Sequence, residues 1–218
     1  MEKIEMTIET QMHILCYGDS NTWGWPPSGW GRHPLDQRWP GVLEASLGDG
    51  YHIIEAGEPG RTTISDLEIY GEEAAVLNRH LNSGSRVDLV ILMLGTNDII
   101  VRPSQSAADI TSNLGVLVGW VQASKEGREQ AAPQVLILSP PHLEQDSAAQ
   151  FVGLDEIMVD KSHQLKELYQ GLAEEMGCAF FDAAEVIRSS SIDGVHLDAD
   201  AHIALGKALA LVCREMLV

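Results

Sequence analysis

Positive charge is scarce in this 218-residue chain. Its 14 lysine and arginine residues are outnumbered by 32 aspartate and glutamate residues, so the formal net charge is −18. Nucleic acids and anionic membrane surfaces attract proteins through basic patches. The charge balance therefore predicts no nucleic-acid partner and no membrane partner, and it favours solubility.

Cysteine and long apolar runs are also lacking. The three cysteines, Cys16, Cys178 and Cys213, are far apart and odd in number, which is typical of reduced thiols in a cytoplasmic protein. No apolar run approaches the length of a membrane span. Residues 1–11 lack the basic start and apolar centre of a signal peptide. We take them as a loose leader or tag remnant before a single domain over residues 12–218.

Several signatures of chemical sites are missing as well. The nucleophile elbow Gly-x-Ser-x-Gly is absent, because Thr22 stands where its second glycine would be. No Gly-Lys-Ser/Thr phosphate loop occurs. The histidines and cysteines form neither a His-x-x-x-His nor a Cys-x-x-Cys pattern, so we expect no metal site and no cofactor.

The remaining pattern is an alternation of apolar runs and helical segments. Apolar residues make up 44% of the chain, enough for a sizeable core. The expected strands cover residues 14–17, 52–56, 87–94, 135–139 and 179–181, and the expected helices cover residues 39–47, 66–81, 107–124, 155–176 and 199–216. Strands that alternate with helices indicate βαβ units around a parallel sheet.

Ser20 follows the first expected strand within the turn Gly18-Asp19-Ser20-Asn21. Open α/β sheets hold their ligands at the carboxyl ends of the strands. If a helix begins near Asn21, its free N–H groups surround the Ser20 hydroxyl and can stabilise an oxyanion there. In the alternative interpretation, Ser20 only caps that helix.

Three further polar groups fall at strand ends or before the last helix. They are residues 56–63 with Gly60, residues 94–98 with Asn97, and residues 193–198 with Asp193 and His196. A hydrolytic serine needs a base, a group that orients the base, and oxyanion donors. His196 fits the base and Asp193 fits the orienting group. The backbone N–H groups of Ser20 and Gly60 and the amide of Asn97 fit the donors.

Each of these short patterns also has a structural explanation. Asp-x-x-His is common in surface turns, Asn-Asp after a strand forms Asx-turns, and Gly-x-x-Gly occurs in ordinary loops. Their joint placement favours a site, because an open parallel sheet brings its strand ends into one crevice.

Tryptophan is concentrated beside the serine turn, at Trp23, Trp25, Trp30 and Trp39. Such a group suggests an apolar wall for an aromatic or acyl group, although core or interface packing explains it equally well. The residues that we expect around the substrate are Asp19, Asn21, Trp23, Trp25, Pro141, His142 and Val195. For His142, solvent exposure is the alternative.

Taken together, the four blocks resemble those of SGNH hydrolases of the GDSL esterase group. They are Gly18-Asp19-Ser20, Gly57-x-x-Gly60, Gly95-x-Asn97-Asp98 and Asp193-x-x-His196. Longer stretches, such as residues 18–25 and 93–98, are similar to the bacterial arylesterase subgroup. Two residues depart from the pattern. Asn21 replaces the leucine of the GDSL signature, and Gly60 stands where a mycobacterial relative has alanine.

The resemblance implies a flavodoxin-like three-layer α/β/α sandwich with a five-stranded parallel sheet. It implies hydrolysis of short-chain and aryl esters through an acyl-enzyme, with acyl transfer to alcohols. It also implies homo-oligomers, often dimer-based octamers, that act on a small-molecule ester. A carbohydrate O-acetyl esterase is the second interpretation, and a catalytically silent binding protein on the same fold is the third.

Overall fold

A computed structural model describes residues 11–63, 70–81, 86–124, 127, 131–145 and 153–217 of the chain. The expected leader, apart from residue 11, and the start of the helix expected over residues 66–81 lie outside the described residues.

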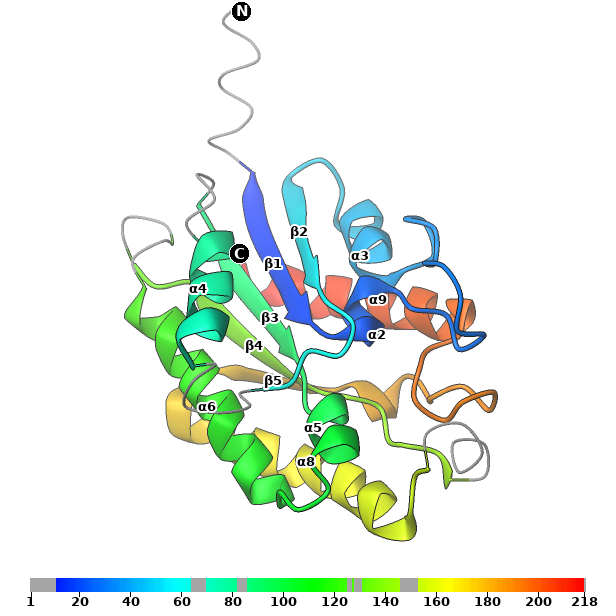
Figure 1. Ribbon diagram of the computed structural model, residues 1–218. Helices are drawn as coiled ribbons and strands as arrows, with labels where there is room; N and C mark the ends of the chain where they lie inside the picture. Colours follow the sequence, from blue (N-terminus) through cyan, green and yellow to red (C-terminus); the bar gives the residue numbers. More distant parts are fainter. Residues whose placement is uncertain are drawn as a thin grey trace, which may run out of the picture.

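Five parallel strands form one sheet at the centre of the molecule (Figure 1). They are β1 (Met12–Gly18), β2 (Tyr51–Gly57), β3 (Leu89–Met93), β4 (Gln134–Ser139) and β5 (Ala179–Asp182). Their order across the sheet is β2-β1-β3-β4-β5. All five expected strands are therefore found, each within two residues of its expected limits.

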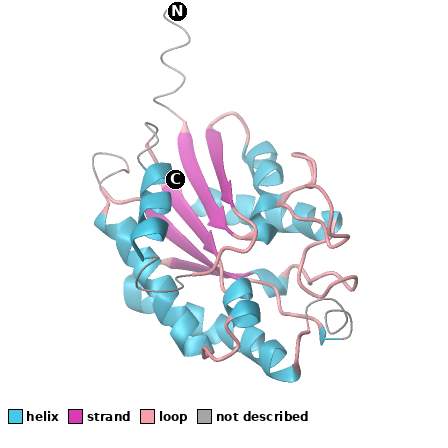
Figure 2. Cartoon of the chain, in the orientation of Figure 1, coloured by secondary structure: helices cyan, strands magenta, loops and turns pink. Residues whose placement is uncertain are grey.

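Helices cover both faces of the sheet (Figure 2). Helices α3 (Trp39–Leu47) and α9 (Ala199–Met216) pack on one face, and α4 (Tyr70–Leu81), α6 (Ala107–Ala123) and α8 (Glu156–Met176) pack on the other. Along β1, Ile14 and Cys16 pack in the core beneath α3 and α9, while Leu15 and Tyr17 pack in the core beneath α4, α6 and α8. Because both faces are buried, β1 reads as a continuous apolar run. The three-layer α/β/α prediction is confirmed.

Helices α6 and α8 begin at residues whose side chains cap them. The Ser106 hydroxyl accepts a hydrogen bond from the backbone N–H of Asp109, and the Asp109 carboxylate accepts one from the Ser106 N–H, which makes a capping box for α6. Asp155 caps α8 through the Met158 N–H, and α8 ends at Gly177 in the left-handed region, with φ of 65°. Among the described helices, none is long and apolar enough to cross a membrane.

The strand order reverses between β1 and β3, since the chain goes from β1 outward to β2 and then returns to β3. A ligand crevice is expected at this topological switch point. Two short helices begin there, α2 (Ser20–Trp23) after β1 and α5 (Thr96–Val101) after β3. Helix α5 is not among the helices expected from the sequence. It brings the Asn97 amide to 3.4 Å from the carboxylate of Asp19, the residue before Ser20.

Candidate active site

Ser20 is the first residue of α2, directly beyond the end of β1. The Asp19 carboxylate caps this helix by accepting from the Asn21 N–H at 2.9 Å. The helix lies close to the sheet because glycines adjoin it: a Cβ at Gly18 would collide with the Thr22 hydroxyl, and a Cβ at Gly57 would collide with the backbone of Trp23. The local sequence thus sets Ser20 on a tight strand-to-helix turn.

Ser20, His196 and Asp193 form one hydrogen-bonded chain. His196 Nε2 lies 3.0 Å from Ser20 Oγ, although the two residues are 176 positions apart. His196 Nδ1 lies 2.6 Å from Asp193 Oδ2. A carboxylate only accepts, so Nδ1 carries the hydrogen and Nε2 is free to accept the serine proton. This is the arrangement of a nucleophile, a base and a group that orients the base.

The environment of Asp193 keeps its carboxylate ionised. Burial by itself raises the pKa of Asp193, but hydrogen bonds from the His196 ring and from the N–H groups of Val195 and His196 outweigh it, so the pKa lies below its ordinary value. Both N–H groups donate to Oδ1 at 2.9 Å. Asp193 therefore holds the turn that carries His196 as well as the imidazole itself.

Gly60 lies in the turn after β2, and Asn97 lies on α5 beside that turn. The turn after β2 is joined to the end of β1 by a bond from the Glu58 N–H to the Gly18 carbonyl oxygen, 3.0 Å long. Gly60 adopts a left-handed backbone with φ of 84°, which favours glycine. Asn97 Nδ2 donates to the carbonyl oxygen of Arg61 at 3.0 Å and approaches Asp19 Oδ2 at 3.4 Å. The three blocks that supply the expected oxyanion donors are thus in contact.

Two buried charged residues support these turns: Arg61, which has no role in the sequence-based hypothesis, and Asp19, which is expected there at the substrate pocket. The Arg61 guanidinium donates to the Gly18 and Ala56 carbonyl oxygens and stacks 4.0 Å from the centre of the Tyr17 ring. It ties the turn of Gly60 to the ends of β1 and β2. These contacts join separate segments, so no local pattern in the sequence indicates them.

Asp19 is buried beside the serine. Burial raises the pKa of Asp19 to about 6, against the lowering effects of the Asn21 N–H, the charge of His196 and the charge of Arg61. Only 2% of the residue is exposed. The structure therefore places Asp19 beneath the serine turn, where its protonation state changes the charge next to Asn97.

Of the two tryptophans expected at the pocket, Trp25 lies beside His196 and Trp23 lies beside Trp25. The Trp25 ring centre is 6.4 Å from that of His196 and 5.6 Å from that of Trp23. The Arg32 guanidinium stacks 5.0 Å from Trp23. The other two tryptophans differ: Trp39 is fully buried in the core, whereas Trp30 is 89% exposed. Core packing thus explains Trp39, while Trp23 and Trp25 form a tilted aromatic pair whose Trp25 ring adjoins His196.

The other expected pocket residues are buried or lie at a separate cavity. Asn21 is buried and donates to the Val195 carbonyl oxygen, and Val195 and Pro141 are themselves buried. His142 is half-buried, with its ring centre 3.9 Å from that of His163. Both histidines line a cavity of about 450 Å³ whose lining includes neither Ser20 nor His196.

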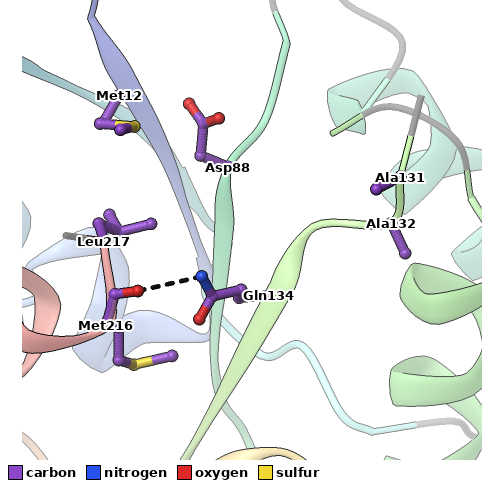
Figure 3. A pocket seen from close by; sticks show the side chains of 7 residues that line it. All are labelled: Met12, Asp88, Ala131, Ala132, Gln134, Met216 and Leu217. Atoms are coloured by element: carbon purple, nitrogen blue, oxygen red, sulfur yellow. Dashed lines mark hydrogen bonds between the residues drawn. The ribbon is translucent and has the colours of Figure 1, made fainter. Parts of the chain in front are cut away.

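A second cavity lies at the opposite end of the sheet. Its volume is about 440 Å³, and it is lined by Met12, Gln134, Met216 and neighbouring side chains at the amino ends of β1 and β4 (Figure 3). Gln134 donates to the Met216 carbonyl oxygen there, at 3.0 Å. Within the described residues, no group of three or more His, Cys, Asp or Glu side chains is placed to hold a metal ion.

Comparisons with known proteins agree with this geometry. The model of the GDSL-like lipase/acylhydrolase family matches residues 16–204. A carbohydrate acetylesterase from Sinorhizobium meliloti is 39% identical, with a TM-score of 0.85 over 95% of this chain and 100% of that one. The native aryl esterase of M. smegmatis is 38% identical, with a TM-score of 0.85 over 94% of this chain and 100% of that one.

More distant structures share the fold alone. A member of the lipolytic G-D-S-L family from Veillonella parvula is 18% identical, with a TM-score of 0.68 over 93% of this chain and 99% of that one. A comparison with curated proteins finds no match.

The parallel sheet and the serine at its switch point define an SGNH hydrolase. The chain belongs to the GDSL-like lipase/acylhydrolase family. It is a carboxylic ester hydrolase, as its family and its esterase neighbours indicate.

Proposed function

We propose that the protein hydrolyses short-chain acyl and aryl esters through an acyl-enzyme formed on Ser20. The observation that carries the proposal is the continuous chain from Ser20 Oγ to His196 Nε2 and from His196 Nδ1 to Asp193 Oδ2, with lengths of 3.0 and 2.6 Å. His196 takes the Ser20 proton as Oγ attacks the ester carbonyl carbon. The carbonyl π electrons move to oxygen and form the oxyanion.

The oxyanion is held by the N–H groups of Ser20 and Gly60 and by the Asn97 amide. Of the two contacts that Asn97 Nδ2 makes, the one to Asp19 is long, at 3.4 Å. The oxyanion can replace it while the bond to Arg61 persists. The tetrahedral intermediate then collapses, and His196 gives its proton to the leaving alcohol. Water, activated by His196 in the same way, releases the acid and restores Ser20.

An added alcohol can replace water in the second step, which gives a new ester by acyl transfer. The aromatic surface of Trp23 and Trp25 beside His196 supports this proposal, because it offers an apolar place for an alcohol. Incubation with p-nitrophenyl acetate and benzyl alcohol should yield benzyl acetate in addition to acetate. Acetate alone at every alcohol concentration would contradict the transfer step.

A carbohydrate O-acetyl esterase is the second candidate. The same tryptophans can stack on sugar rings, and one similar structure is a carbohydrate acetylesterase. The test compares kcat/KM for p-nitrophenyl acetate and phenyl acetate with kcat/KM for the deacetylation of acetylated xylan. We expect the small aryl esters to be preferred. A preference for the polymer would replace the arylesterase proposal with the carbohydrate one.

We also propose that the chain forms a homo-oligomer, dimer-based and as large as an octamer. Trp30 and Leu35 in the segment after α2 are 89% and 51% exposed, which is a large apolar surface for a solvated loop. The net charge of −18 opposes association, and salt screens it over about 8–10 Å. Sedimentation in moderate salt should show a multiple of 23.8 kDa. A single species at the monomer mass would contradict the proposal.

The location proposed for the protein is the cytoplasm. All three cysteines are free, with Cys16 and Cys213 buried, as is usual for a reducing compartment.

A further inference from the structure

Asn21, the residue after the proposed nucleophile, makes a hydrogen bond to the segment that carries the proposed base. Its side chain is buried, with 1% of the residue exposed. Asn21 Nδ2 donates to the carbonyl oxygen of Val195 at 3.1 Å, across 174 positions of the sequence. Val195 directly precedes His196. The bond therefore joins the neighbour of Ser20 to the neighbour of His196.

His33 makes a matching contact on the other side of His196. Its Nε2 lies 3.2 Å from the carbonyl oxygen of Leu197, the residue after His196. A carbonyl oxygen only accepts, so Nε2 carries the hydrogen. The backbone N–H of His33 donates to the Gly24 carbonyl oxygen at 2.8 Å, which fixes His33 to the end of α2. Both carbonyl groups that flank His196 are thus bonded to side chains from the segment that follows β1.

We propose that Asn21 and His33 are positioning residues that hold the His196 imidazole within bonding distance of Ser20. The proposal rests on the function proposed above. Asp193 fixes the turn of His196 from inside, through the N–H groups of Val195 and His196. Asn21 and His33 fix the same turn relative to the serine turn. A shift of about 1 Å between nucleophile and base costs on the order of 100-fold in rate.

The bonding of Asn21 favours this role over a purely structural one. Its Oδ1 is buried and has no hydrogen-bond partner among the described residues. A buried acceptor without a partner destabilises the fold, so an apolar side chain would serve packing better. The GDSL signature has leucine at this position. What the amide adds over leucine is the directed bond to Val195.

The test compares Asn21→Leu and His33→Phe with the parent enzyme on p-nitrophenyl acetate. Leucine and phenylalanine keep similar volumes and remove the donors. We expect each variant to lower kcat by about 10- to 100-fold. KM should stay within about threefold, because the contacts that bind the substrate equally well in the ground state and the transition state are retained. His33→Gln should restore most of the lost kcat, since the Gln amide nitrogen reaches about as far as Nε2. Melting temperatures should stay within about 4 °C of the parent value.

The control is Gln134→Leu, at the far end of the sheet (Figure 3). It also removes a hydrogen bond from a side-chain amide to a backbone carbonyl oxygen. It should leave kcat unchanged. Titration of Ser20 to completion with a fluorophosphonate gives the concentration of folded enzyme, so kcat is expressed per reactive site. If Asn21→Leu and His33→Phe lose titratable sites while kcat per site is unchanged, their role is structural and the proposal is overturned.

Ser20→Ala separates this proposal from the proposed function. If Ser20→Ala abolishes turnover while Asn21→Leu and His33→Phe both keep kcat within about twofold, the positioning proposal is wrong and the mechanism stands. If Ser20→Ala keeps its activity, the mechanism itself is wrong. Loss of kcat in all three variants, with recovery in His33→Gln, supports the positioning role.

Discussion

The Thr63 hydroxyl donates a hydrogen bond to Asp98 Oδ1 over 2.6 Å, and the Thr63 N–H donates to the same carboxylate at 2.9 and 3.1 Å. Asp98 is fully buried on α5, one residue after Asn97. Thr63 lies three residues after Gly60. The pair therefore links the turn of Gly60 to α5, and these two segments carry two of the three proposed oxyanion donors.

Thr63→Val should lower the free energy of unfolding by about 2 kcal/mol, because it removes one hydrogen bond to a buried charged group while it keeps the side-chain shape. Urea denaturation measures this change. The matched control is Ser112→Ala, which removes a hydroxyl bond on the exposed side of α6 and should change stability by less than about 0.5 kcal/mol. Equal effects of the two substitutions would show that Thr63 contributes no more than a surface hydroxyl.

Asp19 should make stability depend on pH. Burial raises the pKa of Asp19 to about 6 in the folded protein, above the ordinary aspartate value of 3.8. The folded state therefore holds this proton more tightly than the unfolded state. The stabilisation of the folded state that this proton provides is complete below about pH 4 and is lost as pH rises through 6. Relative to Asp19→Asn, the wild type should lose about 3 kcal/mol of unfolding free energy between pH 4 and pH 7. A constant difference over this range would contradict the buried carboxyl.

Asp193→Asn should lower kcat by about 1,000- to 10,000-fold with little change in KM, because an amide can donate to His196 and thereby favour the wrong tautomer. Steady-state kinetics on p-nitrophenyl acetate measures the effect. Asp36→Asn, on the exposed segment before α3, should retain full activity. A loss of less than about tenfold for Asp193→Asn would remove Asp193 from the mechanism.

Asn97→Ala should lower kcat by about 100- to 1,000-fold, the usual effect of removing one oxyanion donor. KM should change little, because the donor acts on charge that develops in the transition state. Gln122→Ala removes an exposed amide that donates to Met176 and serves as the control. If Asn97→Ala raised KM and left kcat intact, its amide would bind substrate rather than stabilise an oxyanion.

The strands and long helices are predictable because their signals are local. Strands covered on both faces are continuous apolar runs, as in residues 89–93. Helices α3 and α9 begin and end at the expected residues. Helix α5 escapes prediction because its six residues are too few to show a helical period, and Ile99, Ile100 and Val101 favour strands.

In the candidate site, too, some features are predictable from the sequence and others are not. Ser20 and Asn97 follow the ends of β1 and β3, and the sequence predicts that they lie together because parallel strands bring their carboxyl ends to one edge of the sheet. The contacts of Thr63 with Asp98 and of His33 with Leu197 join residues 35 and 164 positions apart. They depend on how the turns after different strands meet, and nothing in either local sequence indicates them.

The most direct measurement is kcat/KM of Ser20→Ala on p-nitrophenyl acetate, together with mass-spectrometric mapping of a fluorophosphonate adduct on the wild type. The account predicts a loss of at least about 10,000-fold and an adduct on Ser20 alone. Activity of Ser20→Ala within a few-fold of the wild type, or an adduct on another residue, would contradict it.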